Sequence, residues 1–366
     1  MTERDAELFP GLREYLRARY GPEADDAKIE PLAAKTGTIK EGGYGMPYTM
    51  SWTTSGERRR FVLETVRPGD FGHEDRADRA AILLRAYEDY RTLSKHVAAV
   101  DVGAFRDRGP AVSLGETGEA FLLTEFCEGE AYAADFDRVA ERGGLEERDR
   151  ARALALADYL AGIHGEPVSH PTWYRRRMRE LVGSGECIAG IADSYPVPFG
   201  FIDDRLLHEI EALALGWRYR LRPRADRLRT IHGDFHPWNI LFRSGTDFSV
   251  LDRSRGAFGD PADDVASLAV NFLFFALRTA GRFGGPFAEL FRLFWDRYLE
   301  RSGDEGLVEV IAPHLAFRAL VLANPIWYPK ESEPLRRHLF RFILSVLESD
   351  RFEVNRIPGY LKRAGP

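Results

Sequence analysis

The chain has 366 residues, 44% of them hydrophobic, which is enough for about two domains and a sizeable core. A formal net charge of −6 argues against a nucleic-acid-binding protein and mildly favours cationic or neutral small substrates over polyanions. Two widely separated cysteines, Cys127 and Cys187, argue against a disulfide framework and indicate a reducing compartment.

Neither a secretory signal nor a membrane-spanning segment is expected. Residues 1–9 are too charged for a secretory signal. The longest apolar run, residues 268–277, contains Asn271 and is too short to cross a bilayer. The sequence therefore predicts a cytoplasmic monomer or homodimer that binds neither membrane nor nucleic acid.

The first third of the chain predicts a packing helix and a small sheet. Apolar residues near helical spacing place the packing helix at residues 5–20. A second, long amphipathic helix is expected over residues 74–96. Strands are expected at residues 35–40, 48–54, 60–66, 97–105 and 120–124.

A glycine-rich segment lies between the first two expected strands and contains Gly42, Gly43, Tyr44 and Gly45. Glycines in such a turn would let backbone amides approach phosphate groups without interference from Cβ atoms. An ordinary β-turn would have the same composition, so the segment alone leaves both interpretations open.

The rest of the chain is expected to be mainly helical. The arginine-rich run at residues 174–179 can be a solvated helix face or can meet an anionic substrate group. Residues 183–198 are expected to be a surface connection. Asn324, Trp327 and Tyr328 lie on a proline-bounded break. Helices are expected over residues 150–164, 203–221, 265–279, 287–301 and 306–323.

Residues 230–264 carry the side chains that organise the functional prediction. Asn239 is followed by a short apolar strand at residues 240–242, and a second strand at residues 248–251 leads into Asp252. Two strands joined by a short polar turn predict a β-hairpin. The hairpin would bring Asn239 and Asp252 to the same edge.

The side chains expected at this edge suit phosphoryl transfer. Asp234 precedes the hairpin and lies five positions before Asn239, with His232 and His236 beside it. One carboxylate can accept the proton of an attacking hydroxyl, while an amide and a second carboxylate, here Asp252, hold Mg²⁺. The alternative is a polar hairpin rich in ordinary turn-forming residues.

The three sequence motifs resemble those of the aminoglycoside phosphotransferase and choline kinase superfamily. Residues 232–241 (HGDFHPWNIL) are similar to its catalytic motif, and Leu251–Asp252 and residues 259–264 (GDPADD) are similar to the two that follow. The resemblance implies an α+β, two-lobed, protein-kinase-like fold with a small antiparallel-sheet N-lobe and a larger helical C-lobe. The implied nucleotide-binding lobe is residues 1–126 with a hinge at about 122–130, and the catalytic and acceptor-binding lobe is residues 131–366.

The resemblance implies transfer of the γ-phosphoryl group of ATP or GTP to a hydroxyl of an aminoglycoside-, choline- or sugar-like small molecule. It makes Asp234 the base and Asn239 and Asp252 the Mg²⁺ ligands, with His232 and His236 in support. Asp264 would brace the catalytic loop, although Asp263 and Asp264 can also be N-caps of the next helix. The implied nucleotide contacts are Gly43, Tyr44, Gly45 and the main-chain groups of Glu125 and Cys127.

One position departs from the family pattern. The third strand usually carries a basic residue that grips the nucleotide phosphates, and Glu64 stands there instead. A carboxylate would repel phosphates, so either Glu64 faces elsewhere or Lys40 or Arg67 supplies the cation. The alternative function is a catalytically impaired pseudokinase or a nucleotide-sensing scaffold. A protein kinase is disfavoured, because Gly233 replaces the arginine of its His-Arg-Asp motif and no Ala-Pro-Glu segment is present.

Overall fold

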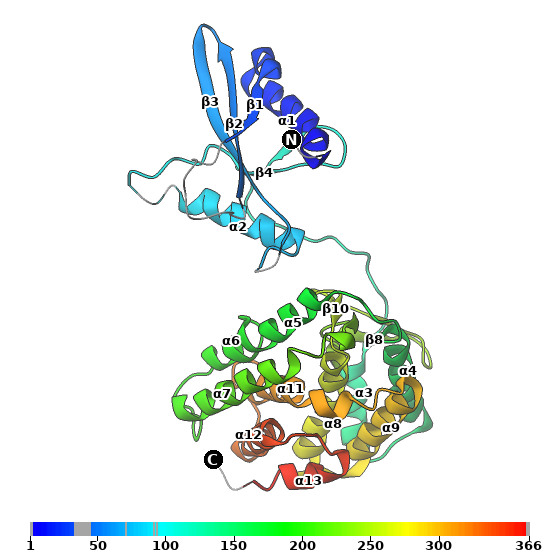
Figure 1. The fold of residues 1–366 in the computed structure, drawn as a ribbon. Coiled ribbons are helices and arrows are strands. Elements are labelled where there is room, and N and C mark those ends of the chain that lie inside the picture. The colour runs from blue at the N-terminus through cyan, green and yellow to red at the C-terminus, as the bar shows by residue number, and fades with distance from the viewer. Residues whose placement is uncertain (1–2, 33–44, 70–71, 91, 93, 364–366) are drawn as a thin grey trace. The chain divides into compact units, whose positions relative to one another are not determined.

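The computed structural model describes residues 3–32, 45–69, 72–90, 92 and 94–363. The chain divides into two compact units, Met1–Thr124 and Glu125–Pro366 (Figure 1). Each unit has its own hydrophobic core. The expected strand at residues 35–40, and with it Lys40, Gly43 and Tyr44, lies outside the described residues.

The first unit is built on a three-stranded antiparallel sheet in the order β1-β2-β3, in which Tyr48 lies opposite Leu63. The predicted helix at residues 5–20 and the strands at 48–54 and 60–66 are confirmed. Its elements are α1 (Glu3–Tyr20), η1 (Pro22–Asp26), β1 (Lys28–Pro31), β2 (Gly45–Thr54), β3 (Glu57–Val66), α2 (Arg76–Asp89), β4 (Gly103–Ala104) and β5 (Val112–Ser113).

Period-two alternation on the sheet decides which side chains form this core. Met50 and Trp52 of β2 are buried together with Leu12 and Leu16 of α1, and Phe61 and Leu63 of β3 pack against the same cluster. The alternate residues of β3, Val62 and Glu64, are exposed. Glu64 is therefore on the sheet face that does not form the core.

Three predictions for the first unit were wrong in extent. The helix expected to reach residue 96 ends at Asp89, and Lys95 has a φ of +64°, which no right-handed helix allows. The strand expected at 97–105 is only the two-residue β4. β4 pairs with β5, and the described residues 120–124 form no strand.

The second unit is mainly helical and is organised around α8 (Figure 1). Residues 262–277 of α8 are all buried, and α9, α11 and α12 pack against it. The elements are β6 (Glu130–Ala131), α3 (Tyr132–Arg142), α4 (Glu147–Ile163), α5 (Pro171–Gly183), α6 (Ile188–Asp193), α7 (Asp204–Leu221), η2 (Ala225–Arg227), β7 (Arg229–Thr230), η3 (Pro237–Asn239), β8 (Ile240–Phe242), β9 (Phe248–Val250), β10 (Phe258–Gly259), α8 (Ala262–Ala280), α9 (Gly285–Ser302), α10 (Leu307–Val310), α11 (Ala312–Ala323), α12 (Glu333–Glu348), η4 (Val354–Arg356) and α13 (Ile357–Tyr360).

The predicted helices of this unit are confirmed, with one segment corrected. Residues 183–198 contain α6 and are not simply a surface connection. Ile188 and Ile191 are three residues apart, so they fall on one helical face, and both are buried in the main core. Along the described part of the chain, every helix is too short or too polar to cross a lipid bilayer.

A buried ion pair fixes the start of α8. Arg227 donates from Nε and Nη2 to the two carboxylate oxygens of Asp260, at 2.8 and 2.9 Å, and also bonds Asp304 at 2.7 Å. The hydroxyl of Tyr174 donates to Asp260 at 2.9 Å. Burial by itself would raise the pKa of Asp260, but Arg227 outweighs this effect and holds the pKa below the ordinary 3.8.

Replacing Asp260 with asparagine is therefore expected to lower stability in a pH-dependent way. A carboxylate whose pKa is depressed by folding stabilises the protein above its unfolded pKa, and that stabilisation is lost as the pH falls through the folded value. Asp260→Asn should lower the free energy of unfolding at pH 7 by about 2 kcal/mol, because Arg227 keeps its other partner. The difference from wild type should shrink below pH 3.8, the ordinary pKa.

Urea unfolding at pH 7 and at pH 3 measures this difference. Asp158→Asn is the matched control, because Asp158 pairs with Arg297 at 2.7 Å but its side chain is 37% exposed. That control should lose less than about 0.5 kcal/mol. An equal loss for Asp260→Asn at both pH values would contradict the assigned cause.

Candidate active site

The predicted hairpin is confirmed. β8 and β9 pair antiparallel with Ile240 opposite Val250, and the amide of Leu251 donates to the carbonyl of Asn239 at 2.8 Å. Asn239 and Asp252 therefore lie at the same end of the hairpin. Asp252 has a φ of +56°, and its side chain is exposed there.

The segment that carries the predicted hinge residues joins this hairpin. Glu125 and Cys127 precede β6, which pairs with β8 so that Ala131 lies opposite Leu241. Gly129 has a φ of +144°, and a Cβ atom there would lie 2.9 Å from the Cβ of Leu241. Glycine is needed at position 129 because the two chain segments approach too closely for a larger residue.

The loop before the hairpin is held through its main chain by Asp264. The carboxylate of Asp264 accepts the amides of His232 and Gly233, both at 2.7 Å, and Nε2 of His164 lies 3.1 Å from it. Asp264 is fully buried, and the N-cap of α8 is Pro261. Asp264 is thus no N-cap, and its carboxylate holds the main chain of the loop that carries Asp234.

Asp234 lies in this loop, with a side chain that is 12% exposed. Nη1 of Arg318 donates to its Oδ1, while Nε of Arg255 and Nε2 of His236 lie 3.6 and 3.7 Å from its Oδ2. Burial by itself would raise the pKa of Asp234, but the positive charges of Arg318 and Arg255 outweigh burial and hold the pKa below 3.8. The carboxylate is therefore ionised at neutral pH.

Both histidines shape the loop through hydrogen bonds that their Nδ1 atoms accept. Nδ1 of His232 accepts the amide of Asp234 at 3.2 Å, and Nδ1 of His236 accepts the amide of Trp238 at 3.3 Å. Burial lowers the pKa of His236 below 6.5 despite the nearby charge of Asp234. His236 is therefore mostly neutral at pH 7, as an Nδ1 acceptor must be.

Asn239 and Asp252 offer oxygen atoms that suit Mg²⁺. Nδ2 of Asn239 donates to the carbonyl of Asp234 at 3.1 Å, and within the described residues its Oδ1 and the carboxylate of Asp252 have no hydrogen-bond partner. Carboxylate and amide oxygens are hard ligands of the kind Mg²⁺ prefers. No group of three or more His, Cys, Asp or Glu side chains in the described part of the chain can hold a metal. Two protein ligands are nevertheless usual for Mg²⁺ that also binds substrate phosphates.

Two residues of the site, Arg318 and Arg255, were not predicted from the sequence. Arg318 of α11 also donates from Nη2 to the carbonyl of Gly233 at 2.8 Å and to Asp263 at 2.7 Å. Arg255 faces Asp234 from the loop after β9. Position 318 is 84 residues from position 234, so spacing could not connect them. A single arginine within the apolar helix sequence APHLAFRALVLA was the available signal, because a buried charge needs a partner.

The predicted phosphate-binding residues belong to the first unit. Gly45 is the first residue of β2, and Arg67 follows β3 and is exposed. Glu64 lies opposite Pro47 in the β2–β3 ladder. Lys40, as noted, lies outside the described residues, so the choice between Lys40 and Arg67 remains a prediction.

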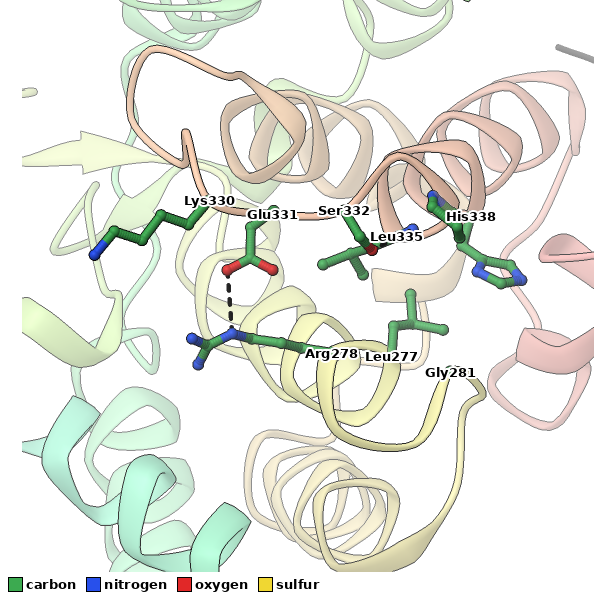
Figure 2. A pocket seen from close by; sticks show the side chains of 9 residues that line it. Leu277, Arg278, Gly281, Lys330, Glu331, Ser332, Leu335 and His338 are labelled. Carbon is green, nitrogen blue, oxygen red and sulfur yellow. Dashed lines mark hydrogen bonds and ion pairs between the residues drawn. The ribbon is translucent and has the colours of Figure 1, made fainter. Parts of the chain in front are cut away.

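A pocket of about 330 Å³ lies where the end of α8 meets the segment before α12 (Figure 2). Arg278 and Glu331 form an ion pair of 3.1 Å between the two sides. No residue of the loop that carries Asp234 lines this pocket, so it is distinct from the candidate site. The proline-bounded break does contact the segment that follows Asp234, because the ring centroid of Tyr328 lies 6.4 Å from that of Trp238.

Comparison with known proteins identifies a family. The family model described as "Phosphotransferase enzyme family" matches residues 49–301, more than half of the chain. No curated protein matches the sequence.

Several solved structures match most of the chain at low identity. An amicoumacin kinase in complex with AMP-PNP, Ca²⁺ and Ami is 14% identical, with 97% of this chain and 100% of that chain covered and a TM-score of 0.42. The ADP-bound aminoglycoside phosphotransferase APH(2'')-Ib is 15% identical, with 95% and 100% covered and a TM-score of 0.34. A choline/ethanolamine kinase family protein from Mesorhizobium loti is 15% identical, with 96% and 97% covered and a TM-score of 0.37. These identities and TM-scores are too low to indicate a substrate.

Proposed function

The chain belongs to the phosphotransferase enzyme family, and from this premise we propose that it transfers the γ-phosphoryl group of ATP or GTP to a hydroxyl of a small molecule. The match confirms the predicted family and the α+β, kinase-like fold class. The observation that carries the proposal is the arrangement of one short hairpin. Asp234 lies in the loop before it, and Asn239 and Asp252 lie at its open end.

Asp234 would orient the acceptor and take its proton. The hydroxyl oxygen forms a bond to the γ-phosphorus while the bond from that phosphorus to the bridging oxygen breaks. The nucleoside diphosphate leaves with the electron pair, and the hydroxyl proton passes to the Asp234 carboxylate. Because the pKa of Asp234 is low, its carboxylate is ionised at neutral pH and can both hold the hydroxyl in line and accept its proton.

Asn239 and Asp252 would hold the metal through their side-chain oxygens. Mg²⁺ held there would offset the negative charge of the nucleotide phosphates. The hydrogen bond from Nδ2 of Asn239 to Asp234 fixes the amide, so that its Oδ1 is the atom left for coordination.

The nucleotide contacts are proposed from the first unit and from the segment before β6. The backbone at Gly43, Tyr44 and Gly45 would cover the phosphates. The main-chain groups of Glu125 and Cys127 would pair with the base. Lys40 or Arg67 would supply the missing cation of the third strand.

The acceptor is proposed to be a small hydroxyl compound. The similar structures are named as kinases of amicoumacin, aminoglycosides and choline or ethanolamine. The hydroxyl class of acceptor is taken from the motif resemblance, and none of these named substrates is extended to this chain.

A second candidate function follows from Glu64. If neither Lys40 nor Arg67 grips the phosphates, the protein would bind nucleotide without turnover and act as a sensing scaffold. Calorimetry combined with phosphate-transfer assays distinguishes the two functions.

The experiment titrates ATP and GTP, each with and without Mg²⁺, into wild type and Asp252→Asn. Wild type should bind one nucleotide in a Mg²⁺-dependent way, and the variant should bind it at least about tenfold more weakly, or ~1.4 kcal/mol. The reason is that asparagine removes the carboxylate charge from the proposed metal site. Asp247→Asn is the matched control, because Asp247 is an exposed carboxylate at the turn end of the same hairpin.

The possible outcomes distinguish the two functions. Mg²⁺-dependent binding followed by transfer to a hydroxyl compound from an acceptor screen would support the kinase. Tight binding without transfer or phosphate release would favour the scaffold. Absence of binding for both nucleotides would overturn both functions.

A further inference from the structure

We propose that Arg318 is a positioning residue for phosphoryl transfer: it binds Oδ1 of Asp234 and so leaves Oδ2 as the oxygen that takes the acceptor's proton. The inference rests on the proposed function and adds to it an atom-level division of roles within the carboxylate. It also places part of the active-site machinery on α11, which carries none of the sequence motifs.

Arg318 holds the loop at two successive residues. Its Nη1 donates to the side chain of Asp234, and its Nη2 donates to the carbonyl of Gly233 at 2.8 Å. The arginine side chain is 7% exposed, so water competes little for these hydrogen bonds. One guanidinium therefore fixes both the carboxylate and the peptide that precedes it.

The guanidinium is itself held in place. Its Nη2 also donates to Oδ1 of Asp263 on α8 at 2.7 Å, and Nη2 of Arg177 on α5 lies 3.7 Å from Oδ2 of Asp263. Arginine has a rigid, planar fork, so partners at both Nη atoms fix the orientation of the whole group. Lysine would keep the charge but could not reproduce this geometry.

The second oxygen of Asp234 is less tightly bound. Nε of Arg255 lies 3.6 Å from Oδ2 and Nε2 of His236 lies 3.7 Å from it, beyond ordinary hydrogen-bond length. Oδ2 thus keeps an acceptor site for the incoming hydroxyl. When that hydroxyl oxygen bonds the γ-phosphorus and the nucleoside diphosphate leaves with the electron pair, the proton goes to Oδ2.

A purely structural role is the competing explanation, because Arg318 also ties α11 to α8 through Asp263. The two roles differ in what they change. A structural arginine affects stability, whereas a positioning arginine affects turnover in protein that is still folded. A misplacement of about 1 Å in catalytic geometry can cost roughly 100-fold in rate.

The test compares Arg318→Lys with Arg227→Lys. Arg227 is the matched control, because it is equally buried and also bonds two carboxylates, Asp260 and Asp304. Phosphate release from Mg-ATP, or from Mg-GTP if that nucleotide binds, is measured with water as the acceptor, together with the Tm of each protein. We expect Arg318→Lys to lower kcat by about 10- to 100-fold with KM for nucleotide within about twofold of wild type. Arg227→Lys should lower the Tm without this loss of kcat.

A second variant covers the case in which Arg318→Lys does not fold. The double variant Arg318→Gln, Asp263→Asn removes one positive and one negative charge together, so no buried charge is left without its partner at position 263. Both new side chains are amides that can still donate hydrogen bonds. It should show the same selective loss of kcat.

The outcomes separate this inference from the proposed function. Equal kcat losses for the Arg318 and Arg227 variants at matched Tm, or an unchanged kcat in Arg318→Lys, would overturn the inference while the kinase stands. A folded wild-type protein that neither releases nor transfers phosphate would instead overturn the proposed function, and the inference with it.

Discussion

Asp234→Asn should lower kcat for phosphoryl transfer by about 1,000-fold, within the range that a positioned general base contributes. Asparagine keeps the shape of the side chain but has no negative charge and cannot take the proton of the hydroxyl. The hydrogen bonds that Arg318 donates to Gly233 and Asp263 do not involve the side chain of Asp234, so the loop should stay folded in the variant. KM for the nucleotide should stay within about twofold, since the nucleotide does not depend on this side chain.

The measurement is steady-state transfer to the acceptor, or phosphate release with water if no acceptor is found. Asp135→Asn is the matched control, because Asp135 is a buried carboxylate that also has two arginine partners, Arg152 and Arg138. The control should lose stability and keep its kcat. Undiminished transfer by Asp234→Asn would show that another residue is the base.

Asp264→Ala should damage both stability and turnover. The substitution removes the acceptor of two buried amides, those of His232 and Gly233, and leaves His164 without its carboxylate. Breaking such a buried network costs about 3–5 kcal/mol of unfolding free energy. Because the amides belong to the loop that carries Asp234, kcat should fall by roughly 100-fold in the protein that remains folded.

Urea unfolding and hydrogen exchange at residues 231–236 measure the two effects. Asp203→Ala is the matched control, since Asp203 is an N-cap whose carboxylate accepts the amide of Leu206 at 2.8 Å in α7. It should cost about 1 kcal/mol and leave kcat unchanged. Unchanged exchange in the loop of Asp264→Ala would contradict the bracing role.

The sequence was most informative where the relevant contacts are local. The hairpin could be predicted because its strands and turn lie within 15 residues, from Asn239 to Leu251 and Asp252. Local periodicity likewise predicted α1, β2 and the large helices, since each buries one face of a continuous segment. The motifs then supplied the family, which the match over residues 49–301 confirms.

The contacts that could not be predicted join segments distant in sequence. Arg318 reaches Asp234 across 84 residues, and His164 reaches Asp264 across 100. Asp264 shows the consequence: from its position before an apolar run it resembles an N-cap, and only the fold brings its carboxylate to the loop amides. Residues 120–124 show the reverse case, because strand-like composition forms no strand without a partner.

Because Arg318 lies on a buried helix outside the motifs, homologues that have lost activity could be missed when sequences are classified by motif. α11 packs against α8 and α12, and its sequence between Ala312 and Ala323 is apolar apart from His314 and Arg318. A substitution that shifts this helix would displace the guanidinium while every motif from His232 to Asp264 stayed intact. A genome survey that scores only motifs would count such a chain as an active kinase. An inventory of inactive homologues should therefore also examine the residue at the position of Arg318, which bonds Asp234 from α11.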